Sequence, residues 1–485
     1  MAQPLVIGID SSTQSTKAEA RNLETGERVG LGRAHHPPTS PPCSQQDPQS
    51  WWIALVGALG QLGDLRAEVV AISVAGQQHG LVVTDSAGHP LRPAKLWNDT
   101  ESAPQAAELV RALGATRWAD ECGSVPVAAF TVTKLAWLVE AEPDLLGDIG
   151  AVGLPHDWLT RKLSGRHVTD RGDASGTGWY DASADPAAAG VRPDLLAAAV
   201  QEAPGGLADP AHWADLLPEV LSASEPAGTI LPDVARELGL PESVLVGPGT
   251  GDNMAAALGL GLGSGDVAFS LGTSGTVYSV AASQTSDPSG AVAGFADASG
   301  QFLPLVCTLN ATKVTDTVAQ WLGADLDEMA ALALAADPHE GTGPTLVPYF
   351  DGERTPDLPD ATGSLTGLRN ETSRESISLA AHDGVLGGLI AGRDALRASG
   401  VPADGRVFLV GGGARSAAYR TRLAELLGCA VRTPAEDESV AAGAALQAAV
   451  VADESDTAAA HAGPEAFAEV ADRWNLGAGS DTEPR

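Results

Sequence analysis

Residues 5–17, L-V-I-G-I-D-S-S-T-Q-S-T-K, decide the fold of this chain. The apolar run Leu5–Ile9 predicts a buried strand, Asp10 closes it, and a turn rich in hydroxyl side chains follows. The pattern recurs roughly half the chain later as V-A-F-S-L-G-T-S-G-T-V-Y-S-V at residues 267–280. Each half is therefore predicted to contain a strand, a small hydroxyl turn and a return strand.

The rest of the chain predicts a mixed α/β fold in both halves. Apolar strands are expected at residues 69–74 and 407–410, and they alternate with alanine- and leucine-rich segments of helical period at residues 376–398 and 439–451. The stretch 181–232, rich in Pro, Ala, Gly and Asp, predicts short helices and loops between the halves.

We expect two large domains, because 485 residues with 44% hydrophobic content are too many for one core. The predicted division is an N-terminal domain of residues 1–246 and a C-terminal domain of residues 247–476. The final segment, residues 477–485, is polar and contains glycine, so we expect it to be a flexible tail.

Charge and cysteine usage limit the partners. A formal net charge of −33 argues against nucleic acid, since little here could replace the counterions around a phosphate backbone. The four cysteines are scattered singly, which favours reduced thiols in a cytoplasmic protein over disulfides or a zinc site. No apolar run reaches the roughly 18 residues of a membrane helix. The oligomeric state is left open, with a homodimer as one alternative.

Asp10 is a candidate metal and phosphate residue. A carboxylate beside a hydroxyl turn could hold Mg²⁺ through water, because Mg²⁺ prefers few protein carboxylates together with phosphate oxygens. The alternative is a simple turn cap. The second turn at residues 272–276 favours phosphate binding, with Thr13 and Lys17 in contact with phosphate oxygens. The chain has no G-x-x-x-x-G-K-[ST] string, the phosphate-binding loop of many nucleotide-binding proteins, so these turns would have to bind the phosphates instead.

The three glycines Gly411–Gly413 follow the strand at residues 407–410 and precede a helical run. A nucleoside could lie against bare backbone there, although a plain strand-to-helix turn explains the glycines equally well.

Asp252 precedes an alanine-rich helical segment within G-T-G-D-N-M-A-A-A, residues 249–257. As a helix N-cap it would satisfy free N–H groups, and the positive helix end is predicted to keep it ionised near neutral pH. The functional alternative is a catalytic base.

A further polar cluster is A-G-Q-Q-H-G at residues 75–80, with L-W-N-D at residues 96–99. Polar groups beside an indole face suit a sugar, which presents hydroxyls and apolar C–H surfaces together. For His79 in isolation, a structural histidine is the alternative.

Together these segments resemble the FGGY family of carbohydrate kinases, with motifs in the same order from Asp10 to about Gly443. The resemblance covers nearly the whole chain and includes V-G-G-G-A-R-S at residues 410–416 and F-T-V-T-K-L-A-W-L at residues 130–138, which is similar to the family's first signature. It implies an α/β fold of two actin-like (ribonuclease H-like) ATPase domains with a catalytic cleft between them, acting with ATP and Mg²⁺.

The resemblance also implies residue roles. Asp252 takes the proton from the sugar hydroxyl, and Asp10 supports the metal and the phosphates. Substrate-binding residues are Gln78, His79, Trp97, Asn98 and Asp252, and nucleotide-binding residues are Thr13, Ser15, Lys17, Gly272, Thr273, Gly412, Gly413 and Ser416.

Within the family, the motifs resemble the branch that phosphorylates D-xylulose, including D-A-S-G-T-G-W-Y-D at residues 173–181. Glycerol kinases carry an Arg-Glu pair where this chain has Gln78 and His79. The expected reaction is transfer of the γ-phosphoryl group of MgATP to O5 of D-xylulose in pentose catabolism. Another FGGY sugar or polyol kinase, acting on ribulose or gluconate, is the alternative. A non-catalytic actin-like ATPase or sugar sensor is disfavoured, since the chain shows no appended peptide-binding domain.

Overall fold

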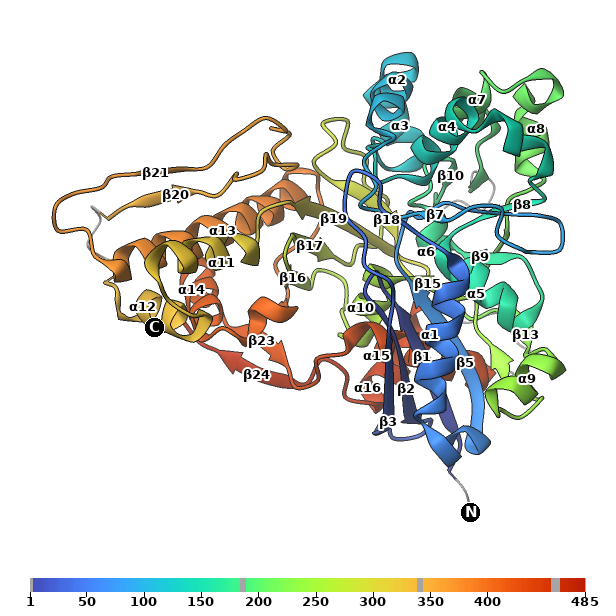
Figure 1. The fold of residues 1–485 in the computed structure, drawn as a ribbon. Coiled ribbons are helices and arrows are strands. Elements are labelled where there is room, and N and C mark those ends of the chain that lie inside the picture. Colours follow the sequence, from blue (N-terminus) through green and yellow to red (C-terminus); the bar gives the residue numbers. More distant parts are fainter. Residues whose placement is uncertain (1–2, 184–188, 338–342, 455–462, 485) are drawn as a thin grey trace.

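The computed structural model describes residues 3–183, 189–337, 343–454 and 463–484, and two mixed β-sheets organise them (Figure 1). The first sheet runs in the order β13 (Gly228–Thr229), β14 (Leu245–Val246), β5 (Val69–Gly76), β1 (Leu5–Ser11), β2 (Ser15–Asn22) and β3 (Arg28–His35), with β15 (Thr250–Gly251) also paired to β5. The second runs in the order β18 (Ala293–Ala296), β19 (Phe302–Thr308), β17 (Gly275–Ser279), β16 (Val267–Leu271), β22 (Val407–Val410), β23 (Val431–Pro434) and β24 (Gly479–Thr482).

The two sheets repeat one topology. In the first, β1, β2 and β3 pair antiparallel and β5 lies parallel to β1. In the second, β16, β17 and β19 pair antiparallel and β22 lies parallel to β16. The strands predicted at both turns are confirmed, and the duplication inferred from the sequence is a duplication of structure.

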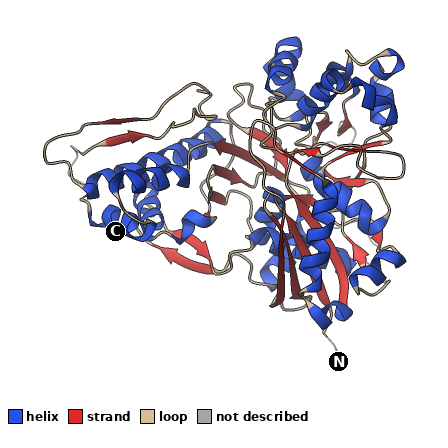
Figure 2. Ribbon diagram, viewed as in Figure 1, coloured by secondary structure: helices blue, strands red, loops and turns tan. Residues whose placement is uncertain are grey.

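The faces of β1 alternate between two layers of helices, as the period of two along a strand requires. Leu5, Ile7 and Ile9 pack in the cluster that includes α1 (Pro48–Gly60) and α5 (Pro155–Ser164), whereas Val6 packs against α15 (Ser439–Glu454). Figure 2 shows helices on both sides of this sheet. Strand β1 is therefore buried on both faces, which explains its nearly continuous apolar run.

Helix α15 belongs to the second half in sequence but packs on the first sheet and on α10 (Asp252–Gly259). Two glycines make the approach possible: a Cβ on Gly8 would collide with the carbonyl oxygen of Ala441, and a Cβ on Gly443 with that of Ala255. The strand that carries Asp10 near its end and the helix that begins at Asp252 are thus held against the same helix.

The remaining elements cover the sheets and build two outer lobes (Figure 1). In the first half they are β4 (Gln45–Gln46), β6 (Val82–Thr84), β7 (Ala94–Lys95), α2 (Ala103–Leu113), α3 (Ala115–Cys122), α4 (Thr131–Ala141), β8 (Ala151–Gly153), β9 (Val168–Asp170), α6 (Arg171–Ala174), β10 (Tyr180–Asp181), β11 (Gly190–Val191), α7 (Pro193–Val200), α8 (Pro210–Ala214), β12 (Glu219–Leu221) and α9 (Pro232–Leu238). In the second half they are α11 (Thr312–Leu322), α12 (Leu326–Ala335), β20 (Thr345–Val347), β21 (Ser364–Thr366), α13 (Arg374–Ala398), α14 (Ala417–Leu427) and α16 (Pro464–Arg473). The helices predicted at residues 376–398 and 439–451 are α13 and α15.

The predicted domain boundary between residues 246 and 247 stays a prediction. The structure shows that strand pairing in the first sheet extends beyond this boundary. Strand β15 still pairs with β5, so the first sheet continues to Gly251.

The C-terminal segment, predicted to be a flexible tail, differs from expectation, because β24 pairs antiparallel with β23 and Arg432 forms an ion pair with Asp481 at 2.7 Å. Backbone pairing along an open sheet edge orders residues 479–482 despite their polar composition. Among the described residues, no helix is both long and apolar enough to cross a membrane.

Candidate active site

A cavity of about 300 Å³ lies at the junction of the two halves. The segments after β1 and β5 contribute from the first half, and the start of α10 and the turn between β16 and β17 contribute from the second. Several residues predicted for different ligands line this one cavity: Thr13, Gln78, His79, Trp97, Asp252, Gly272 and Thr273.

Sheet register brings Gln78 and Asp252 together. Strands β5 and β15 are parallel, with Thr250 opposite Ala75 and Gly251 opposite Gly76. The segments that leave the two strands therefore emerge side by side. Asn253 Nδ2 donates to Gln78 Oε1 at 2.6 Å and to Asp252 Oδ1 at 3.1 Å. Gln78 Nε2 is buried and has no hydrogen-bond partner among the described residues, so it remains available as a donor to a ligand.

His79 is held in an unusual backbone conformation with φ of 63°. Its ring stacks on Phe130 with centroids 4.9 Å apart, and Nδ1 lies 2.9 Å from the carbonyl oxygen of Gly176. Because a carbonyl only accepts, Nδ1 carries the proton and Nε2 is left as an acceptor. Burial, with smaller contributions from the charges of Lys134 and Arg354, lowers the pKa of His79 to about 3. The imidazole is therefore neutral at physiological pH.

Asp252 is the first residue of α10, and Gly251 rather than Asp252 is the N-cap. Burial, with the negative charge of Asp10 as a second cause, raises the pKa of Asp252 to about 7. The prediction that the helix end keeps this carboxylate ionised near neutral pH is therefore too simple, because burial and Asp10 outweigh the favourable helix end. A carboxylate with a pKa close to neutral is well matched to accept a proton.

Asp10 lies at the end of β1, almost fully buried. Its Oδ1 accepts from the hydroxyl of Ser12, and its Oδ2 accepts from Lys17 Nζ at 3.0 Å. Lys17 also pairs with Glu438 from the second half. Burial disfavours the ammonium ion, but the two carboxylates outweigh it and raise the pKa of Lys17. Lys17 is therefore a fixed positive charge beside Asp10.

A second cavity, of about 400 Å³, is lined by Lys17, Gly412, Glu438 and neighbouring residues. The structure thus splits the predicted nucleotide residues: Lys17 and Gly412 line this cavity, whereas Thr13, Gly272 and Thr273 line the first. Gly413 is buried in the turn that begins with Gly411. The backbone φ of Gly411 is 84°. Ser416 is the N-cap residue of α14, and its buried hydroxyl has no partner among the described residues.

Ser15 lines neither cavity. It is buried in β2, opposite His35 of β3, so the structure does not place it with the predicted nucleotide residues. The strand begins at Ser15, and its side chain is enclosed by the sheet instead of projecting from the turn.

Trp97, Asn98 and Asp99 differ in their position and in their contacts. Trp97 lines the first cavity and donates from Nε1 to Thr13 Oγ1 at 2.9 Å. Asn98 does not line it, and its Oδ1 is buried without a partner among the described residues. Asp99 is fully buried and accepts from Lys95 Nζ at 3.0 Å and from the backbone of Ser44 at 3.0 Å. Asp99 therefore anchors the loop that presents Trp97.

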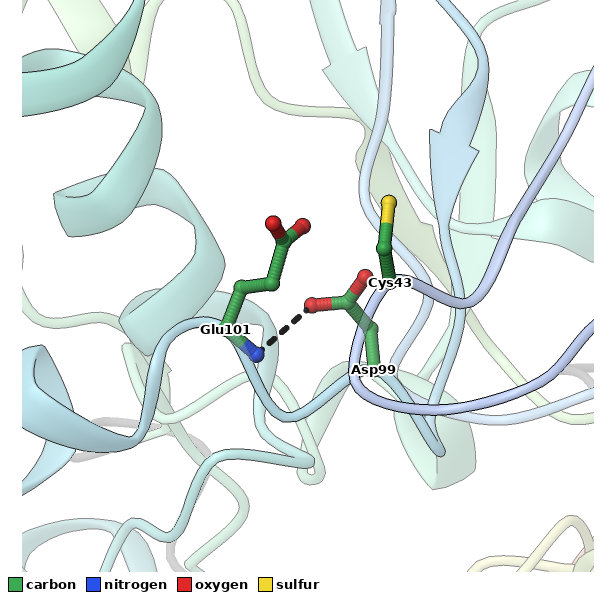
Figure 3. Close-up of side chains that lie close together, drawn as sticks. All are labelled: Cys43, Asp99 and Glu101. Carbon is green, nitrogen blue, oxygen red and sulfur yellow. Dashed lines mark hydrogen bonds between the residues drawn. The ribbon is translucent and has the colours of Figure 1, made fainter.

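Figure 3 shows Asp99 with Cys43 and Glu101, the one group of three potential metal ligands that the described residues bring together. The dashed line marks the bond from the backbone of Glu101 to Asp99 Oδ1, 3.1 Å long. Lys95 Nζ contacts Asp99 at 3.0 Å and Glu101 at 2.6 Å. The ammonium ion of Lys95 is already paired with both carboxylates, so the group is a structural ion-pair cluster and a poor cation site.

Near the first cavity, buried acidic side chains hold in place the backbone that leads to Asp252. Asp170 accepts from the backbone of Gly172 and Asp173, each at 2.9 Å, and from Thr250 Oγ1 at 2.7 Å. Burial raises the pKa of Asp170 to about 6 and that of Asp173 well above its usual value. These bonds tie α6 to β15, two residues before the candidate base.

Sequence reasoning missed several cavity residues. Asn253 stood in the quoted motif beside Asp252, and only the structure shows that it joins Asp252 to Gln78. Phe295 lies 5.2 Å from the ring of His79, and Arg354 lines the same cavity. Arg354 lies in a stretch without secondary structure after β20, where no periodic pattern could have indicated it.

Comparison with known proteins agrees with this architecture. Residues 5–189 and 267–452 match the N-terminal and C-terminal domains of the FGGY family of carbohydrate kinases. The chain is 46% identical over 478 residues to the xylulose kinase of Streptomyces rubiginosus, a match that covers 98% of this chain and 92% of that protein. It is 33% identical over 437 residues to the xylulose kinase of Escherichia coli K12, covering 87% and 85%.

Among solved structures, the xylulose kinase from Bifidobacterium adolescentis superposes with a TM-score of 0.83 at 42% identity, covering 93% of this chain and 94% of that one. The predicted α/β fold with two actin-like ATPase domains is confirmed by the duplicated sheets together with these matches. The chain belongs to the FGGY family of carbohydrate kinases.

Proposed function

We propose that this enzyme transfers the γ-phosphoryl group of ATP to O5 of D-xylulose and forms D-xylulose 5-phosphate. The observation that carries the proposal is the position of Asp252, a carboxylate with a pKa near neutral, in the cavity shared by both halves of a sugar kinase. The names of the relatives at 46% and 33% identity support D-xylulose as the acceptor.

In this mechanism Asp252 accepts the proton of the 5-hydroxyl group as O5 forms a bond to the γ-phosphorus of ATP. The bond between that phosphorus and the β,γ-bridging oxygen breaks, and ADP leaves. Gln78 Nε2 donates to a sugar oxygen, and His79 Nε2 accepts from a sugar hydroxyl. The indole of Trp97 offers an apolar face to sugar C–H groups. The protein contributes position and charge, which are the main demands of phosphoryl transfer.

We propose that the phosphates lie between the two cavities, near Asp10 and Lys17. When bound with ATP, Mg²⁺ neutralises phosphate charge. The donor set fits this ion, since one buried carboxylate beside an open cavity suits a cation that keeps several water ligands. Both Asp10 oxygens already accept protein hydrogen bonds, so we expect Asp10 to act through Mg²⁺-bound water.

We also propose that the enzyme is cytoplasmic, because its four free cysteines fit a reducing compartment.

The test is ADP release by the purified protein with a panel that includes D-xylulose, ribulose, gluconate and glycerol, with mass spectrometry of the product. We expect the highest kcat/KM with D-xylulose and a product carrying phosphate on O5. A higher kcat/KM with another sugar would reassign the substrate. ADP formation without a phosphosugar would indicate an ATPase that does not use a sugar acceptor.

A further inference from the structure

Arg354 is presented to the first cavity by a firmly held loop. The side chain of Glu353 is buried, and its Oε1 accepts from the backbone of Leu309 at 2.6 Å and of Arg354 at 2.8 Å. Glu353 Oε2 accepts from Asn310 Nδ2 at 2.9 Å, and that same amide donates to the carbonyl oxygen of Gly352 at 2.7 Å. The two residues that precede the arginine are therefore fixed to the segment that follows β19.

The guanidinium of Arg354 has no hydrogen bond or ion pair to the residues that the structure describes. Most arginines of this acidic chain lie against a carboxylate, as Arg422 does with Asp383 at 2.9 Å. Among the described residues lining the first cavity, Arg354 and Asp252 are the charged side chains, since His79 is neutral. A guanidinium with five donors and no acceptor is left facing the ligand.

The charges of Arg354 and Asp10 act on different titratable residues of the cavity. Arg354 acts on His79, whose pKa it helps to lower, whereas Asp10 acts on Asp252, whose pKa it helps to raise. Asp10 also lies beside Lys17 of the second cavity. Asp252 enters the cavity from the start of α10, and Arg354 enters it from the loop held by Leu309 and Asn310, so the two charged side chains reach a bound sugar from different elements.

We propose that Arg354 is a specificity-determining residue, whose guanidinium donates hydrogen bonds to the carbonyl oxygen at the ketose end of the substrate. This inference rests on the proposed function. A ketose presents at that end a carbonyl oxygen, which only accepts, next to a hydroxyl group. Arg354 supplies the donor for the carbonyl oxygen and His79 Nε2 the acceptor for the hydroxyl. The pair thus recognises a hydroxyketone, while Asp252 activates the hydroxyl group on C5.

The test compares D-xylulose with xylitol, in which the carbonyl group is reduced to a hydroxyl group. Dissociation constants are measured by calorimetry without ATP for wild type, Arg354→Gln and Arg354→Lys, together with kcat and KM for D-xylulose. Arg369→Gln is the matched control, because Arg369 is exposed in the same part of the chain and lines neither cavity. Thermal unfolding checks that all variants fold.

For Arg354→Gln we expect the dissociation constant and KM for D-xylulose to rise about tenfold or more, as loss of a hydrogen bond from a charged donor predicts. The constant for xylitol should change much less, KM for ATP should stay unchanged, and Arg354→Lys should recover part of the affinity. Arg369→Gln should resemble wild type.

Equal weakening of both ligands by Arg354→Gln would overturn the inference, as would a loss confined to kcat or to KM for ATP, which would place Arg354 on the transferred phosphoryl group. Failure of the proposed function is distinct, because the wild type itself would then not phosphorylate D-xylulose.

Discussion

Asn253 donates a 2.6 Å hydrogen bond to Gln78, and this bond joins the segment after β5 to the first turn of α10. The chain neighbours of the two residues are Asp252 and His79, the candidate base and a candidate sugar-binding residue. The two residues come within reach of each other because β5 and β15 lie in parallel register immediately before them. The proposed sugar-binding and proton-accepting residues therefore follow one pair of adjacent strand ends.

Asp252→Asn should lower kcat by about 10²- to 10⁴-fold, the range that general base catalysis commonly contributes. An amide cannot accept the proton of the sugar hydroxyl. Stability should change little, because the N-cap of α10 is Gly251 and the side chain is of similar size. Steady-state kinetics and calorimetric sugar binding check this. Wild-type turnover in the variant would show that Asp252 does not accept the proton.

The pH profile follows from the pKa of Asp252, raised to about 7 mainly by burial. The ionised form is the base, so kcat/KM for the sugar should rise as pH increases through about 7 and then level off. His79 should add no step between pH 5 and 8, because its pKa is about 3. A flat profile across pH 5 to 8 would contradict the assignment of Asp252.

Asp10→Asn should reduce turnover strongly and leave the fold intact, since it removes the carboxylate beside the proposed phosphate site. It should also lower the pH midpoint of the remaining activity, because the charge of Asp10 is one cause of the raised pKa of Asp252. Residual activity measured against pH separates the two effects. An unchanged midpoint would mean that Asp10 does not act on Asp252.

His79→Ala should raise KM for the sugar about tenfold or more, as loss of one good hydrogen bond and a stacked ring predicts. KM for ATP should change much less. The exposed His89 provides the matched control, and His89→Ala should behave as wild type. An unchanged sugar KM in His79→Ala would make His79 a purely structural histidine.

Gly443→Ala should destabilise the protein by about 1–3 kcal/mol, the usual cost of overpacking a well-filled core. The new Cβ would collide with the carbonyl oxygen of Ala255 and force α10 away from α15. Gly387→Ala is the control, because Gly387 lies in α13 with open space around its Cα, and alanine there should stabilise the helix by about 0.5–1 kcal/mol. Denaturant unfolding of both variants measures the difference.

The sequence alone predicted the strands at residues 5–9 and 267–271, which are found in β1 and β16, the hydroxyl turns that follow them, and helices α13 and α15. Apolar periodicity and small turn residues act over a few neighbouring positions, so they can be recognised without tertiary structure. They also indicated His79 and Asp252 as candidate site residues, because each follows a predicted strand or precedes a predicted helix.

Tertiary structure decided which of these residues meet. The register of β5 against β15 set the bond from Asn253 to Gln78, and the glycine contact of α15 placed α10. Burial beside Asp10 raised the pKa of Asp252, and an edge pairing ordered β24. Arg354 entered the cavity from an irregular loop. Each of these depends on groups far apart along the chain, and local sequence patterns carry no information about such distances or about the burial they produce.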